Sequence, residues 1–123
     1  MESKKVLAVV EDLFFTVKIN EAAKRAGLGI TFVKSELDAL EQAKLQPALI
    51  IVDINFQGVD PLNLIRKLKA DDATRRINLI GYLSHVQGEL KLQAQEAGCD
   101  MVMPRSAFSQ NLPQILKRHS GSP

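Results

Sequence analysis

The chain has 123 residues, of which 46% are hydrophobic and 24% charged, and this predicts one globular domain over 1–118 with a frayed tail at 119–123. A formal net charge of +2 is too small to indicate nucleic acid or an anionic membrane as partner. Because Cys99 is the single cysteine, an internal disulfide is excluded, and we expect a cytoplasmic protein without a membrane segment.

Short apolar segments that predict β-strands alternate with segments that predict helices. In chain order we expect a strand at 6–10, a helix at 14–27, a strand at 29–33, a helix at 36–45, a strand at 48–53, a helix at 59–72, a strand at 77–83, a helix at 88–98, a strand at 100–103 and a helix at 109–118. The strand at 48–53 is apolar at every position before its final aspartate, which predicts burial on both faces.

Local signals mark several helix ends. Ser35 is expected to cap the second helix. Asp60 as N-cap, followed by Pro61 at the first helical position, is a strong signal for the start of the third helix. Gly27 and Gly98 are expected to end the first and fourth helices.

Two further expectations concern helix faces. In the first helix we place Val17, Ala22 and Ala26 near one apolar face. In the last helix Pro113 falls early, where its missing N–H costs least.

Five β-α repeats predict an α/β fold: a doubly wound, five-stranded parallel sheet of the flavodoxin-like type, in three αβα layers. Tyr82 and Cys99 are expected to be buried in its core. In such sheets ligands bind beyond the carboxyl ends of the strands, so functional residues are sought there.

Polar residues follow four of the five predicted strands. The first strand ends on Glu11 and Asp12, the third on Asp53, the fourth on Ser84, and Arg105 follows the fifth. Carboxylates in a shared crevice repel each other unless a cation is present, and hard oxygen ligands at an open surface suit Mg²⁺. A hydroxyl and a guanidinium beside them can bind an anion, which indicates a site that accepts a phosphoryl group on a carboxylate.

The turn after the first strand has no glycine-rich loop, which disfavours a nucleotide site. We also find no convincing nucleophile and base pair, so we expect no enzyme on a small-molecule substrate; bound flavin would revive that interpretation.

Four segments resemble the receiver domain of two-component response regulators, over nearly the whole chain. They are VLAVVED (6–12), ALIIVDINFQGVDPLNLIRKLK (48–69), LIGYLSH (79–85) and AGCDMVMPRSAF (97–108). They agree with that family in residue type, order and position relative to the strands.

The resemblance implies that Asp53 is the phosphorylated carboxylate. It implies that Glu11 and Asp12, with Asp53 and the backbone carbonyl of Asn55, hold Mg²⁺ directly or through water. It further implies that Ser84 hydrogen-bonds a phosphoryl oxygen and moves on activation.

The sequence departs from the family at several of these positions. The near-invariant lysine of the family aligns with Arg105, and the proline after it with Ser106. Two alternatives stay open for Arg105, which either binds phosphate or pairs permanently with Asp53. His85 stands where the family has a small residue, and Val102 replaces the aromatic residue of the fifth strand.

The resemblance therefore implies a receiver that takes a phosphoryl group from a histidine kinase or phosphotransfer protein and signals to a downstream protein effector. The implied output face is roughly 88–117, and we expect a monomer or weak dimer. The alternative is a degenerate receiver that binds its partner without phosphorylation; Arg105, His85 and Val102 favour it.

Overall fold

The computed structural model describes residues 5–84 and 88–119. Its strands are β1 (Lys5–Val9), β2 (Gly29–Val33), β3 (Leu49–Asp53), β4 (Leu79–Leu83) and β5 (Met101–Pro104). Its helices are α1 (Leu13–Arg25), α2 (Glu36–Ala43), α3 (Pro61–Ala70), α4 (Gly88–Ala97) and α5 (Arg105–Arg118). The expected alternation of strands and helices is confirmed.

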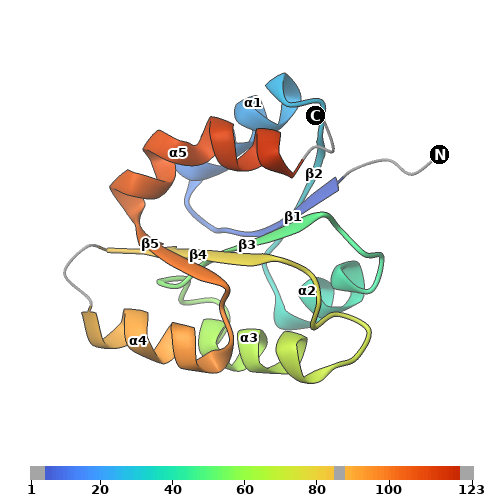
Figure 1. Ribbon diagram of the computed structural model, residues 1–123, viewed down its shortest axis with the longest axis vertical. Coiled ribbons are helices and arrows are strands. Elements are labelled where there is room, and N and C mark those ends of the chain that lie inside the picture. Colours follow the sequence, from blue (N-terminus) through green and yellow to red (C-terminus); the bar gives the residue numbers. More distant parts are fainter. Residues whose placement is uncertain (1–4, 85–87, 120–123) are drawn as a thin grey trace.

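The five strands form one parallel sheet in the order β2-β1-β3-β4-β5. Figure 1 shows α1 and α5 covering one face and α2, α3 and α4 covering the other. The predicted doubly wound, three-layer α/β fold is thus confirmed. Because β3 lies at the centre of the sheet, all five of its residues are buried, including Asp53.

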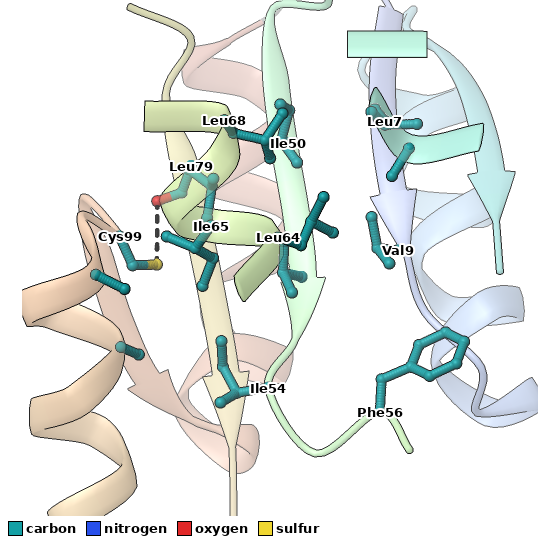
Figure 2. Packing of buried hydrophobic residues seen from close by; sticks show 14 of the residues in the cluster. Leu7, Val9, Ile50, Ile54, Phe56, Leu64, Ile65, Leu68, Leu79 and Cys99 are labelled. Carbon is teal, nitrogen blue, oxygen red and sulfur yellow. Dashed lines mark hydrogen bonds between the residues drawn. The ribbon is translucent and has the colours of Figure 1, made fainter. Parts of the chain in front are cut away.

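The sheet separates two apolar clusters because successive strand side chains point to opposite faces. Ile50 and Val52 pack toward α2, α3 and α4, whose apolar residues Figure 2 shows from close by. Leu49 and Ile51 pack toward α1 and α5. Asp53, the last of the five residues of β3, follows Leu49 and Ile51 in this alternation and therefore lies on the α1/α5 face.

The predicted helix signals are confirmed. The Ser35 hydroxyl accepts a hydrogen bond from the Asp38 N–H at 3.1 Å, and the Asp60 carboxylate accepts one from the Asn63 N–H at 3.1 Å. Gly27 follows α1 with a φ of 74°, which a residue without a Cβ adopts at little cost.

The predicted apolar face of α1 is wrong at Val17, whose side chain is 51% exposed. The helix instead buries Phe15, Ile19 and Ala23, which are spaced four residues apart. Phe15 packs against β4, so a large ring that sequence periodicity left unassigned sets the rotation of the helix.

The predicted start of the last helix is also wrong, because α5 begins at Arg105 and not at Ser109. Phe108 is fully buried against Tyr82, and this packing stabilises the extra first turn. Pro113 consequently lies inside the helix, where its missing N–H leaves the Ser109 carbonyl without its usual donor.

No helix within the described ranges is long and apolar enough to cross a membrane. The predicted tail falls almost wholly outside those ranges, since only His119 of 119–123 is described.

Candidate functional site

The carboxyl ends of the parallel strands meet at one edge of the sheet, and the polar residues expected there do lie at those ends. β1 and β4 flank β3 on either side, so Asp12 and Ser84 follow the two strands next to Asp53. Arg105 begins α5 directly after β5. The topology therefore brings the site residues to one edge although they are far apart in sequence.

Asp53 is the last residue of β3, and only 5% of its surface is exposed. Its Oδ1 accepts a hydrogen bond from the backbone N–H of Asn55 at 2.9 Å. Burial raises the pKa of this carboxyl above its ordinary value; the Asn55 N–H and Arg105 oppose the rise, while Asp12 and Glu11 add to it. The Asn55 N–H and Arg105 thus offset only part of the cost of burying the Asp53 carboxylate.

The acidic pair after β1 has two different environments. Asp12 caps α1, with its Oδ1 accepting a hydrogen bond from the Phe14 N–H at 2.7 Å, and the Thr16 hydroxyl donates to the Asp12 carbonyl at 3.0 Å. Glu11 is exposed. Both carboxylates lie close enough to Asp53 to raise its pKa.

The carboxylates that the structure describes at this edge fit a cation site that keeps bound water, but not one formed by three or more side-chain ligands. In the part of the chain that the structure describes, no three His, Cys, Asp or Glu side chains are grouped so that they could hold a metal ion. Mg²⁺, however, takes one or two carboxylates and keeps several waters. The repulsion of Asp53 by Asp12 and Glu11 is relieved by such a cation, so the residues fit a water-rich Mg²⁺ site.

Asn55 connects the loop after β3 to the end of β4. Its Oδ1 accepts a hydrogen bond from the Ser84 N–H at 2.9 Å, and the Ser84 Oγ lies 3.5 Å from the same oxygen. The second contact is at the outer limit of a hydrogen bond, so the Ser84 hydroxyl is only weakly held.

Within the described part of the chain, Arg105 contacts an aromatic ring and no carboxylate. Its guanidinium carbon lies 5.6 Å from the centroid of the Phe15 ring, which is within the range of a cation–π interaction. Its Nε is buried and has no hydrogen-bond partner within 5–84 and 88–119. Among the described residues no acid lies within 4.0 Å of its guanidinium, so the permanent pair with Asp53 is not found there.

A hollow of about 520 Å³ opens beside these groups, and its lining combines acidic, basic, hydroxyl and aromatic side chains. The lining residues are Asp12, Phe14, Phe15, Ser84, Arg105, Ser106 and Ser109. The first turn of α5 lies at the same edge without a side-chain cap, and helix N-termini favour anions. The hollow can therefore take an anionic group at the edge of the sheet where β3 ends on Asp53.

The sequence did not reveal the aromatic stack beneath the site. Tyr82, correctly expected in the core, lies between Phe15 and Phe108 at centroid distances of 4.8 and 4.7 Å. Its hydroxyl is buried without a hydrogen-bond partner in the described ranges, and burial raises the pKa of Tyr82 far above its usual range. The available signal was strand periodicity, because Tyr82 pairs in register with Asp53 on the same face.

The other positions at which the sequence departs from the receiver family are Ser106, Val102 and His85. Ser106 lies in the first turn of α5 and lines the hollow. Val102 is buried in the cluster under α2, α3 and α4, so no aromatic ring occupies that place. His85 lies outside the described residues.

Comparisons with known proteins find similarity in structure alone. No protein-family model matches the sequence, and no curated protein matches it significantly. A response regulator from Hahella chejuensis has a TM-score of 0.85 at 20% identity, over 97% of this chain and 96% of that one.

Two other similar structures carry further information in their descriptions. The receiver domain of a sensor histidine kinase from Pseudomonas aeruginosa, with a magnesium ion coordinated in its active site cleft, has a TM-score of 0.81 at 20% identity, over 98% of this chain and 100% of that one. A phosphorylated cyanobacterial phytochrome response regulator has a TM-score of 0.79 at 19% identity, over 95% and 91% of the two chains. This chain therefore has the fold of response-regulator receiver domains.

Proposed function

We propose that this protein is a receiver domain that accepts a phosphoryl group on Asp53, in the presence of Mg²⁺, from a phosphohistidine of a kinase or phosphotransfer protein. The observation that carries the proposal is a buried carboxylate at the end of the central strand, at the sheet edge where Asp12, Ser84 and Arg105 line one hollow. The similar structures with magnesium and with a phosphoryl group support it.

The transfer forms a bond between an Asp53 carboxylate oxygen and phosphorus while the bond from phosphorus to the donor nitrogen breaks. Within the described ranges the Asn55 N–H engages Oδ1, which leaves Oδ2 to attack. Glu11, Asp12, Asp53 and the Asn55 carbonyl would hold Mg²⁺, directly or through water, and the cation would supply charge neutralisation. Ser84 and Arg105 then donate hydrogen bonds to the phosphoryl oxygens.

The proposed output is a protein contact on the face formed by α4, β5 and α5. Leu92 is 55% exposed and Met101 is 44% exposed on these elements, and exposed apolar side chains favour a protein partner. With Val102 in place of an aromatic ring, the signal passes by another route than the usual movement of that ring. The phosphorylation-independent alternative would be favoured by an Arg105–Asp53 pair, which is not found among the described residues.

The test is the intact mass of the protein after incubation with acetyl phosphate. We expect one phosphoryl adduct that requires Mg²⁺ and disappears in Asp53→Ala. Asp72→Asn is the matched control, because Asp72 is exposed and outside the site, and its adduct should equal that of the wild type.

An adduct of equal size in Asp53→Ala would contradict the proposal. So would the absence of an adduct, even with a phosphohistidine donor, combined with no spectroscopic response to Mg²⁺. Tyr82 supplies that response, because the chain contains one tyrosine and no tryptophan.

A further inference from the structure

We infer that Phe15 is a positioning residue that holds Arg105 away from Asp53 until the phosphoryl group arrives. The inference rests on the proposed function and adds a residue to which neither the sequence nor the comparisons assign a role. It starts from the contact between the Arg105 guanidinium and the Phe15 ring, at 5.6 Å.

The Phe15 ring is itself held firmly in place. It is 2% exposed, stacks on Tyr82 at 4.8 Å and forms a T-shaped contact with Phe14 at 5.4 Å. Because Tyr82 in turn stacks on Phe108, the ring that carries Arg105 belongs to a packed column anchored on β4 and α5. The column offers the guanidinium a fixed, flat surface.

Arg105 has two competing partners in this site. Arg105 contacts Phe15, Phe15 stacks on Tyr82, and Tyr82 is in register with Asp53, so the guanidinium and the carboxylate lie at the same edge of the sheet. An arginine–carboxylate pair in a buried setting is a strong interaction. The Nε of Arg105 nonetheless has no hydrogen-bond partner in the described part of the chain. The cation–π contact with Phe15 therefore selects a position in which the guanidinium forgoes that pair.

This position has a functional consequence. With Arg105 on Phe15, the guanidinium does not occupy the Asp53 carboxylate, whereas an Arg105–Asp53 pair would compete with Mg²⁺ and with the phosphoryl donor. After transfer the phosphoryl oxygens present more charge than the carboxylate, and the side chain can then move so that its Nε, which has no partner among the described residues, donates to them. Arginine is found at aromatic faces more often than lysine, which links Phe15 to the replacement of the usual lysine by Arg105.

The first test compares Phe15→Leu, Arg105→Ala and the double variant by Mg²⁺ titration followed by NMR and by the rate of adduct formation. In Phe15→Leu we expect the Mg²⁺ affinity and the rate of adduct formation each to fall about tenfold. This fold-change corresponds to the free energy of a desolvated cation–π contact. In the double variant both should return to the values of Arg105→Ala, because no guanidinium remains to compete. Phe15→Tyr, which keeps the ring face, should behave as the wild type.

Phe108→Leu is the control for packing, because it removes a ring from the same column, 6.1 Å from Phe15, but keeps the Phe15 ring beside Arg105, so its effect should be smaller than that of Phe15→Leu. If Phe15→Leu does not fold, Phe15→Met replaces it with a flexible side chain of similar volume. A loss that persists unchanged when Arg105→Ala is added would mean that Phe15 acts through packing alone, and would overturn the inference.

A second readout separates this inference from the proposed function. Without metal or phosphodonor, the NMR signal of the Arg105 Nε–H should be shifted upfield by the Phe15 ring. Adding Asp53→Asn should leave that signal nearly unchanged in the wild type but move it in Phe15→Leu, where Arg105 pairs with Asp53. Equal responses in both backgrounds would overturn the inference, whether or not the protein accepts a phosphoryl group.

Discussion

At the scale of single residues, the site is a set of polar groups with fewer partners than their burial requires. Asp53 accepts one backbone hydrogen bond, the Tyr82 hydroxyl is buried without a partner in the described ranges, and so is the Arg105 Nε. Buried polar groups without partners cost free energy, typically about 1–3 kcal/mol each. The site is therefore a place where stability is given up for an open arrangement of acceptors and donors.

Asp53→Asn should stabilise the metal-free protein by about 1 kcal/mol near neutral pH, because the amide keeps an oxygen for the Asn55 N–H and removes a buried charge. The folded-state pKa of Asp53 is raised, so the folded protein binds a proton more tightly than the unfolded chain. The stability of the wild type should then fall as pH rises from about 4 toward that raised pKa, and this fall should be missing in the variant.

Urea unfolding at several pH values without Mg²⁺ measures this difference. Asp72→Asn serves again as control and should keep the pH dependence of the wild type. An Asp53→Asn protein that is less stable than the wild type at neutral pH would show that the carboxylate is well compensated.

At the scale of elements, local signals define where helices start, but packing decides how they are rotated and how far they extend. The caps of α2 and α3 are short-range interactions between residues three apart, so Ser35 and Asp60 could be recognised without the fold. Phe15 and Phe108 act through Tyr82, which comes from another part of the chain. Their contacts turn α1 and lengthen α5 beyond the sequence-based expectation.

Gly81 in β4 should be sensitive to the smallest added side chain. A Cβ at this position would meet Ile54 Cδ1 at 2.7 Å, Ile54 Cγ1 at 3.0 Å and the Cys99 sulfur at 3.3 Å. Figure 2 shows Ile54 and Cys99 in this well-packed cluster. Gly81→Ala should therefore cost about 1–3 kcal/mol of unfolding free energy through overpacking.

Gly88→Ala is the matched control, because a Cβ there meets nothing within 4 Å at the start of α4. It should be neutral or slightly stabilising, since alanine favours the helix and restricts the unfolded chain. Equal losses in the two variants would contradict the packing argument for Gly81.

At the scale of the whole molecule, a single sheet lies between two apolar clusters, one on each of its faces. Leu68 of α3 belongs to the first cluster and Leu112 of α5 to the second, and each is 1% exposed. β3 contributes alternate residues to both. We therefore expect the two apolar clusters, with the helices that cover them, to unfold together.

Leu68→Ala and Leu112→Ala should each cost about 3 kcal/mol. Because Tyr82 lies on the Leu112 side, its fluorescence tests whether the Leu68 side is coupled to it. In both variants the fluorescence and circular dichroism unfolding curves should coincide and shift together. A fluorescence transition in Leu68→Ala that stays at the wild-type midpoint would show that the layers unfold separately.

The sequence by itself determined the elements, their order and the positions of Asp53 and the acidic pair. An apolar strand that ends on an aspartate is visible along the chain, and five strand-helix repeats imply a parallel sheet whose ends meet at one edge. These features follow from periodicity and chain direction, which are local properties.

Only the tertiary structure decided which partner each site residue takes. Arg105 could reach either Asp53 or an aromatic ring, and the packed column under Phe15 settles that choice among the described residues. The choice depends on the small difference in free energy between a buried Arg105–Asp53 ion pair and the cation–π contact of Arg105 with Phe15. That difference depends on the distances between side chains of β3, β4, α1 and α5, which no local sequence pattern contains.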